Sequence, residues 1–174
     1  MLAFCETFKS LISLKSLGLE FSFCDIASVV SDSFLNGLSN CFEISGLQNL
    51  TLEFGYCAKI TDSGFDFFEK VFKKLINLQS ISLKFRYCKQ VTDKGINKLI
   101  EALGNLQNLK SLNLEWSSCP NLTSTGLDSL KQSLSLLKSL QKIDLNFDHC
   151  PLLTNEGILS LCKALENLPF GYFL

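Results

Sequence analysis

The segment "FRYCKQVTDKG" at residues 85–95 decides the fold, because the chain contains three near copies of it. Taken alone it looks like a reactive site. Cys88 lies between Arg86 and Lys89, and flanking cations lower the pKa of a cysteine. The copies are "FGYCAKITDSG" (54–64), "WSSCPNLTSTG" (116–126) and "FDHCPLLTNEG" (147–157). A residue type that recurs at a fixed step serves the repeat rather than one reaction.

Four residue types keep the same step of 31 residues along the chain. They are Cys57, Cys88, Cys119 and Cys150; Thr61, Thr92, Thr123 and Thr154; Gly64, Gly95, Gly126 and Gly157; and Leu52, Leu83, Leu114 and Leu145. We interpret the four cysteines as buried structural thiols, since free cysteine is among the most buried residue types. One thiol per stacked strand gives a linear row, which cannot converge on a zinc ion. Neighbouring side chains in such a row point in parallel, which disfavours disulfides between them.

Two periodicities alternate within each copy. The segments "LTLEF" (50–54), "ISLKF" (81–85), "LNLEW" (112–116) and "IDLNF" (143–147) place apolar residues at every second position, which predicts half-buried strands. The recurring threonines then stand at N-cap positions before helical patterns. Asp62 and Asp93 follow two of these threonines and favour the first helical turn. Leucine and isoleucine at helical spacing predict buried faces for 95–106 and 126–140.

A strand and a helix in each copy predict a stacked α/β solenoid. The shared template, L-x-x-[LI]-x-L-x-[FW]-x-x-C-x-x-[LIV]-T-x-x-G, resembles the leucine-rich repeat, specifically its cysteine-containing and ribonuclease-inhibitor-like subclasses. The resemblance implies a curved parallel β-sheet on the concave side and α-helices on the convex side. It also implies that each recurring cysteine hydrogen-bonds the backbone of the adjacent turn. We expect one domain over 1–174 with about five repeats: a half repeat at 1–13, an irregular repeat at 14–46, and regular repeats at 47–77, 78–108, 109–139 and 140–170.

The composition narrows the class of partner. The net charge of −1 gives no support to a nucleic-acid or anionic-membrane surface. The N-terminus has no basic segment before an apolar one, so we expect no secretion signal. No apolar run reaches the roughly 18 residues of a membrane span. We therefore expect reduced thiols and an intracellular location, in the cytoplasm, with the cytoskeleton or a cilium as further options.

The strand residues between the core positions differ from copy to copy, and we expect partner specificity there. The residue before each cysteine also varies, and Phe23, Tyr56 and Tyr87 predict an aromatic row along one edge of the sheet. Such a row is either a set of binding anchors or a cover for the strand-to-turn corner. The candidate partner-binding residues are Phe23, Tyr56, Lys84, Arg86, Tyr87, Glu115, Asp148 and His149.

Two cations on the predicted sheet have different surroundings. Lys84 has Glu53 and Glu115 on the neighbouring strands, which indicates a cross-strand ion pair or a charged docking site. Arg86 has Gly55 and Ser117 as neighbours, so we expect no partner for it within the sheet. We therefore expect Arg86 to make an external contact.

The sequence favours a binding protein over an enzyme. Asp148, His149 and Cys150 are adjacent, but neighbouring strand residues point to opposite faces and cannot form a nucleophile–base pair. No phosphate-binding loop, dinucleotide motif or metal-spaced cluster is present, so we expect no cofactor and no metal. We expect a non-catalytic protein-interaction scaffold or structural subunit of a larger assembly, without nucleic acid, membrane or small-molecule partners. The alternatives are a substrate-recognition module of a ubiquitin-ligase-type complex and an enzyme inhibitor.

Overall fold

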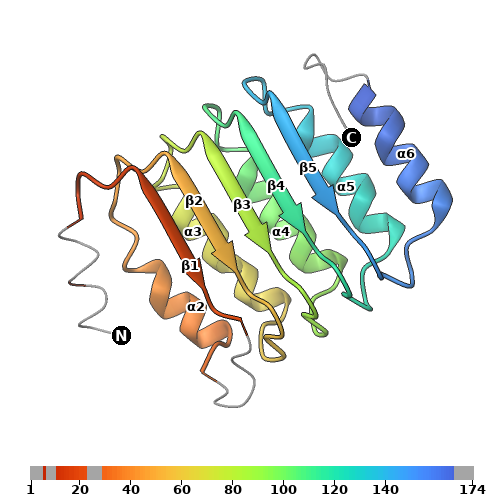
Figure 1. The fold of residues 1–174 in the computed structure, drawn as a ribbon, viewed down its shortest axis with the longest axis horizontal. Helices are drawn as coiled ribbons and strands as arrows, with labels where there is room; N and C mark the ends of the chain where they lie inside the picture. The colour runs from red at the N-terminus through yellow and green to blue at the C-terminus, as the bar shows by residue number, and fades with distance from the viewer. Residues whose placement is uncertain (1–5, 7–10, 23–28, 167–174) are drawn as a thin grey trace.

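The computed structural model describes residue 6, residues 11–22 and residues 29–166 of the chain. Within this part, strands and helices alternate, and all strands join one parallel sheet in sequence order (Figure 1). The strands are β1 (Ser16–Glu20), β2 (Asn49–Glu53), β3 (Ser80–Lys84), β4 (Ser111–Glu115) and β5 (Lys142–Asn146). The predicted α/β class with a parallel sheet is confirmed.

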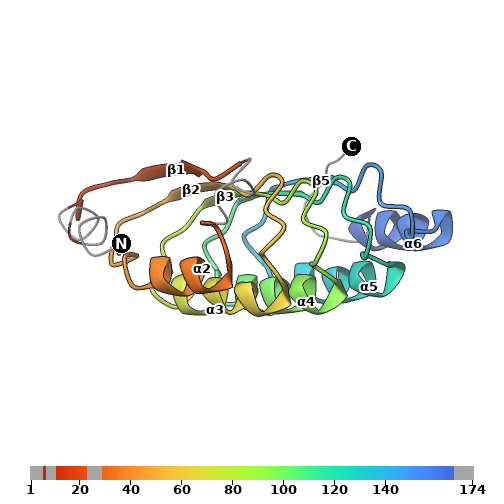
Figure 2. The same cartoon turned by 90° about the horizontal axis from the view of Figure 1, so that it is seen from below.

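The helices form a second layer on one side of the sheet, and the other side of the sheet carries no described helix (Figure 2). They are α2 (Asp32–Ser39), the 3-10 turn η1 (Asp62–Phe65), α3 (Asp66–Phe72), α4 (Asp93–Leu103), α5 (Ser124–Leu134) and α6 (Asn155–Glu166). Among the described residues, none of these helices has the length and apolar character needed to cross a bilayer.

The strand register follows the spacing of the sequence copies. Leu50 lies opposite Ile81, and Ile81 lies opposite Leu112. The first step is longer, because Leu17 pairs with Leu50. Side chains alternate between the two faces of a strand, so a slip of one residue would turn every apolar residue away from the helices. This register keeps Leu50, Ile81 and Leu112 buried on the helix side.

Each of the strands β2 to β5 begins and ends one residue earlier than the sequence pattern predicts. The predicted 50–54, for example, is Asn49–Glu53 in the structure. The ladder nevertheless continues past the assigned end, because the Phe54 N–H donates to the Lys84 carbonyl over 2.7 Å. The aromatic residue that follows each strand therefore still lies in the layer between sheet and helices.

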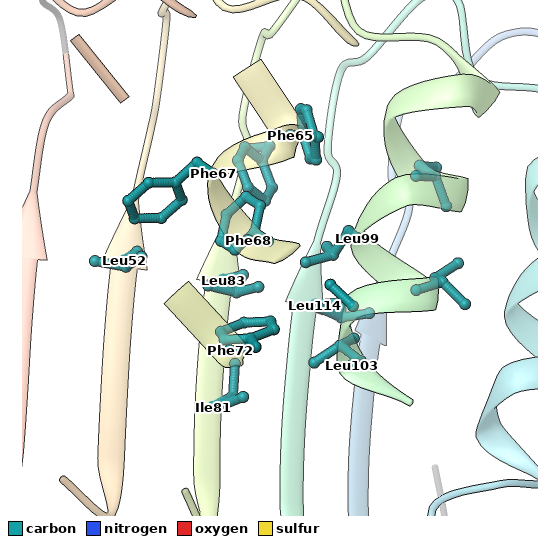
Figure 3. Packing of buried hydrophobic residues seen from close by; sticks show 14 of the residues in the cluster. Leu52, Phe65, Phe67, Phe68, Phe72, Ile81, Leu83, Leu99, Leu103 and Leu114 are labelled. Atoms are coloured by element: carbon teal, nitrogen blue, oxygen red, sulfur yellow. The ribbon is translucent and has the colours of Figure 1, made fainter. Parts of the chain in front are cut away.

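A row of aromatic rings runs through the core beneath the strand ends. Phe54 stacks on Phe85 with ring centroids 5.4 Å apart, and Phe85 stacks on Trp116 at 4.6 Å. Phe67, Phe68 and Phe72 enter the same core from α3 (Figure 3). Trp116 and the phenylalanines of α3 are at most 1% exposed. Large flat side chains thus fill the space between the layers from both sides.

The predicted helix faces are buried, although the helices are shorter than predicted. Leu99 and Leu103 lie on α4 and pack toward Leu114 of β4 (Figure 3). The helix α5 ends at Leu134, so Leu137 lies in the following turn, yet it is only 2% exposed. The leucine spacing therefore predicts burial correctly and overestimates helix length.

Candidate binding surface: the sheet face and its rim

A carboxylate from one sequence copy joins it to the next. The Thr92 N–H donates to Oδ1 of Asp62 over 2.8 Å, and the Thr92 hydroxyl donates to Oδ2 over 2.7 Å. The Gly95 N–H donates to the same Oδ1 over 3.0 Å. Asp32 holds Thr61, and Asp93 holds Thr123, through the same pair of threonine donors. We call this arrangement the inter-repeat clip.

The recurring glycine belongs to the same contact. A Cβ on Gly95 would lie 2.7 Å from Oδ1 of Asp62 and 3.0 Å from Cγ1 of Val91. The T-x-x-G signature therefore marks where the carboxylate of the preceding copy enters. The sequence pattern predicts Asp62 and Asp93 only as residues of the first helical turn, and their bonds to the next copy are not predicted. The signal was present, because the aspartate, threonine and glycine recur together.

The four recurring cysteines lie inside the molecule at the end of each strand. Each donates its thiol hydrogen to the carbonyl of the aromatic residue in the preceding copy: Cys57 to Phe21 (3.2 Å), Cys88 to Phe54 (3.0 Å), Cys119 to Phe85 (2.9 Å) and Cys150 to Trp116 (3.0 Å). Burial raises the pKa of Cys119 to about 12 and also raises the pKa of Cys150. Thiols held in the protonated form are poor nucleophiles and poor metal ligands.

One cysteine departs from the expectation of reduced thiols. Cys41 is buried and disulfide-bonded, so that expectation is wrong at this position. Among the other cysteines that the structure describes, Cys57, Cys88, Cys119, Cys150 and Cys162 carry no disulfide.

The side of the sheet away from the helices presents polar side chains, and we call it the sheet face. Its described members on β2 to β5 are Thr51, Glu53, Ser82, Lys84, Asn113, Glu115, Asp144 and Asn146. Most are half-buried by their neighbours along and across the strands, Asp144 is exposed, and Glu115 is 9% exposed. The face is therefore an open, mainly polar surface with two pairs of charges set into its centre.

The charge pairs differ from the sequence prediction at Arg86. Lys84 Nζ lies 2.5 Å from Oε1 of Glu53, one of the two predicted carboxylates. Arg86 binds Glu115 through both Nε and Nη2, the latter 3.0 Å from Oε2. The prediction that Arg86 has no partner in the sheet is wrong, because its long side chain reaches the diagonal neighbour rather than the opposite residue.

A serine hydroxyl also binds the carboxylate of the Arg86–Glu115 pair. The Ser117 hydroxyl donates to Oε1 of Glu115 over 3.0 Å. Hydrogen bonding from Arg86 lowers the pKa of Glu115 below its ordinary value, against the opposing effect of burial. Both cations at the centre of the sheet face are thus neutralised within the protein.

The residues before the cysteines form a rim along the carboxyl ends of the strands, and all four adopt the left-handed conformation. Their φ angles are 58° at Tyr56, 56° at Tyr87, 58° at Ser118 and 57° at His149. Left-handed backbone is uncommon outside glycine, and for bulky residues it is strained. A hydrogen bond to the next copy stabilises this strained backbone: the Tyr56 N–H donates to the Arg86 carbonyl over 2.7 Å. Tyrosine and serine carry no sequence signal for this conformation, and histidine is only enriched in it, so the sequence does not predict it.

The two rim tyrosines stack on each other. Their ring centroids lie 4.3 Å apart with 13° between the ring planes. Hydrogen bonds from Ser118 and then Tyr56 lower the pKa of the Tyr87 phenol. Tyr87 is 39% exposed. Phe23, the third member of the predicted aromatic row, lies outside the described residues.

The "DHC" residues lie in the turn beyond β5 rather than in the strand. Asp148 and His149 are exposed, while the Cys150 thiol points inward to the Trp116 carbonyl. The separation of His149 from Cys150 therefore comes from the left-handed turn, not from strand alternation as predicted.

A hollow of about 370 Å³ lies between α2 and α3 on the helix layer. Its charged lining residues are already engaged: Asp32 with Thr61, Asp66 with Lys98, and Lys70 with Asn36. In the described part of the chain, no three His, Cys, Asp or Glu side chains are grouped to hold a metal ion. The hollow therefore offers no chemistry comparable to the exposed sheet face.

Comparison with solved structures shows where this architecture occurs. The C-terminal domain of tropomodulin from Caenorhabditis elegans superposes with a TM-score of 0.61 at 13% sequence identity, over 94% of this chain and 90% of that chain. Actin-binding site 2 of leiomodin-1 superposes with a TM-score of 0.60 at 13% identity, over 94% and 86%. The likeness shows the fold. No protein-family model matches the chain, and no curated protein sequence matches it.

Proposed function

We propose that this protein is a non-catalytic interaction module that binds another protein on its sheet face and rim. The observation that carries the proposal is the contrast between the two sides of the sheet. Buried residues repeat in type from strand to strand, while Thr51, Ser82, Asn113 and Asp144 occupy equivalent exposed-side positions and differ. A regular frame that holds a variable open surface is typical of solenoid binding proteins.

Within this proposal the chain is a leucine-rich repeat solenoid of the cysteine-containing, ribonuclease-inhibitor-like kind. It has about five repeats of 31 residues, with the boundaries given above. The thiol-to-carbonyl bonds of the recurring cysteines support this assignment, since they match what that resemblance implies. The intracellular location, and the absence of nucleic-acid, membrane and small-molecule partners, stay predictions.

The structural neighbours support a protein-interaction role in general terms. One of them is an actin-binding site of leiomodin-1, so actin is a direct candidate to test by co-sedimentation. The rim also supports the proposal. Tyrosine is a frequent anchor at interfaces, and Tyr56 and Tyr87 are held there despite backbone strain.

The test compares a blocked sheet face with a matched change on the helix layer. Ser82→Arg with Asn113→Arg adds two long cations to the sheet face. Thr125→Arg with Gln132→Arg adds the same charge to exposed positions of α5. Both variants and the parent are used to capture partners from the source cells, after circular dichroism shows that each is folded.

The proposal predicts that the sheet-face variant loses specific partners and that the α5 variant keeps them. Loss from the α5 variant alone places binding on the helix layer and contradicts the proposal. Turnover by the isolated protein that survives both pairs of changes would contradict its non-catalytic part.

A further inference from the structure

The last strand leaves one edge of the sheet open. In the part of the chain that the structure describes, β5 pairs with β4 and with no other strand. The Lys142 N–H donates to the Lys110 carbonyl over 2.9 Å. The Asn146 carbonyl accepts from the Trp116 N–H over 2.8 Å. In a parallel sheet, residues bonded to one neighbouring strand alternate with residues that face the other side. The residues on and just beyond β5 that turn their N–H and C=O groups away from β4 are therefore Ile143, Leu145 and Phe147.

The apolar layer beneath this edge is only half covered. In the preceding copy, Leu114 of β4 and Leu127 of α5 are each 1% exposed. Their equivalents one copy later, Leu145 and Ile158, are half-buried. Helix α6 lies beyond β5 on the helix side, with no described strand over it, and its Leu159 is 58% exposed (Figures 1 and 2). We call the outer side of β5 together with these α6 side chains the β5 edge.

The inner copies show what covers an equivalent surface. Strand β3 lies parallel to β2, and its Ile81 and Leu83 are at most 1% exposed between the sheet and the helices. The β5 edge continues this copy-to-copy interface by one step. An extended segment with apolar residues at every second position fits there without a helix of its own, because α6 already extends the helix layer past β5. A second copy docked edge to edge would bring its own helix layer against α6, so the structure favours a single segment over a dimer.

Two charges within β5 set a preference for the residues of that segment. Lys142 and Asp144 are exposed, and both lie inside the regular strand Lys142–Asn146. A strand paired with β5 places one side chain directly opposite each of them, about 5 Å away. Opposite charges in such cross-strand pairs stabilise the sheet, and like charges destabilise it.

We propose that the β5 edge binds an extended segment of a partner protein as a further strand parallel to β5. Its apolar residues lie opposite Ile143 and Leu145, and a basic residue lies opposite Asp144. Backbone hydrogen bonds to an open strand edge provide affinity, and alternate side chains provide specificity. The inference goes beyond the proposed function, because it needs the edge of the sheet and not the centre of the sheet face.

The experiment measures amide hydrogen exchange of the full chain, labelled with nitrogen-15, with two peptides of identical composition. The peptide EIKLTF alternates apolar and polar residues, and EKTILF groups its apolar residues together. Binding of EIKLTF should slow exchange of the Ile143, Leu145 and Phe147 amides several-fold. The Lys142 amide, already bonded to Lys110, should change little. EKTILF should bind more weakly and give no such alternation.

A charge reversal tests the register. The parent should bind EIKLTF about 1.5- to 5-fold more tightly than EIELTF, as expected for one cross-strand pair. Asp144→Lys should reverse this preference. The matched control, Asp128→Lys on α5, changes an exposed carboxylate of the helix layer and should leave the preference unchanged.

Three results would overturn the inference: equal affinity for EIKLTF and EKTILF, slowed exchange centred on other strands or on the helices, or a preference that Asp144→Lys does not reverse. Residues 167–174 lie outside the described part of the chain and are the competing occupant. If the Ile143, Leu145 and Phe147 amides exchange as slowly in the free chain as the Leu114 amide, the chain covers its own edge and the inference is wrong. The Ser82 and Asn113 variant tests the sheet face separately, so each idea can fail without the other.

Discussion

Replacing Asp62 with alanine removes the acceptor of three hydrogen bonds that join two neighbouring copies. The donors are the Thr92 N–H, the Thr92 hydroxyl and the Gly95 N–H. Hydrogen bonds to a charged acceptor contribute about 1.5–3 kcal/mol each, and water replaces part of this at a half-buried site. We expect the free energy of unfolding to fall by about 2–4 kcal/mol. In a chain of this size the melting temperature then falls by roughly 5–15 °C.

A double-mutant cycle with Gly95→Ala tests the geometry of the clip directly. In the parent protein the added Cβ would lie 2.7 Å from Oδ1 of Asp62. In the Asp62→Ala background that collision is gone, although Cγ1 of Val91 still lies 3.0 Å away. The cost of Gly95→Ala should therefore be smaller there, with a coupling energy of about 1 kcal/mol. Urea unfolding followed by the fluorescence of Trp116 measures each term.

The control is Asp128→Ala, which removes an exposed carboxylate from α5 and should change stability by less than about 0.5 kcal/mol. If Asp62→Ala costs no more than this control, or if the costs of the Asp62 and Gly95 changes simply add, the clip does not join the copies as described.

Three further predictions concern the rim, the Arg86–Glu115 ion pair and the thiols. His149→Gly should raise the free energy of unfolding by about 0.5–1 kcal/mol in urea, because it relieves left-handed strain at an exposed residue, whereas Ser117→Gly should lower it. Arg86 lowers the pKa of Glu115, so the stability this carboxylate adds is full above its ordinary pKa of 4.5 and is lost as the pH falls through the lower folded-state value. Glu115→Gln should therefore be less stable than the parent at pH 7, and the difference should shrink on acid titration. A thiol reagent at pH 8 should modify half-buried Cys162 faster than Cys119 in the native protein.

Much of the fold follows from spacing alone. The step of 31 residues and the alternation within each strand predict the parallel sheet and its buried leucines. The prediction from spacing succeeds because stacked copies pack against one another. Equivalent positions in the inner copies therefore have equivalent neighbours, and the same residue type is buried at each of them. The aspartate–threonine–glycine clip was readable in principle, since its three members recur together. The sequence pattern does not show which donors the aspartate binds, because the carboxylate accepts hydrogen bonds from the next copy rather than from its own helix.

The surface could not be predicted to the same depth. The sequence predicts an external contact for Arg86 because the strand register shows only which residues lie directly opposite. A long side chain also reaches diagonal neighbours, and Arg86 binds Glu115 in this way. The left-handed rim is not predicted by the sequence, because Tyr87 and Ser118 adopt φ values that usually indicate glycine. Interactions of exposed side chains depend on rotamers and local turns, which periodicity does not encode.

Photo-cross-linking in the source cells tests the central claim most directly. A benzoyl-phenylalanine at position 113 places the reactive group on the sheet face, and one at position 132 places it on α5. We expect a discrete cross-linked protein from position 113 and none from position 132. A specific product from position 132 with none from position 113 would contradict it.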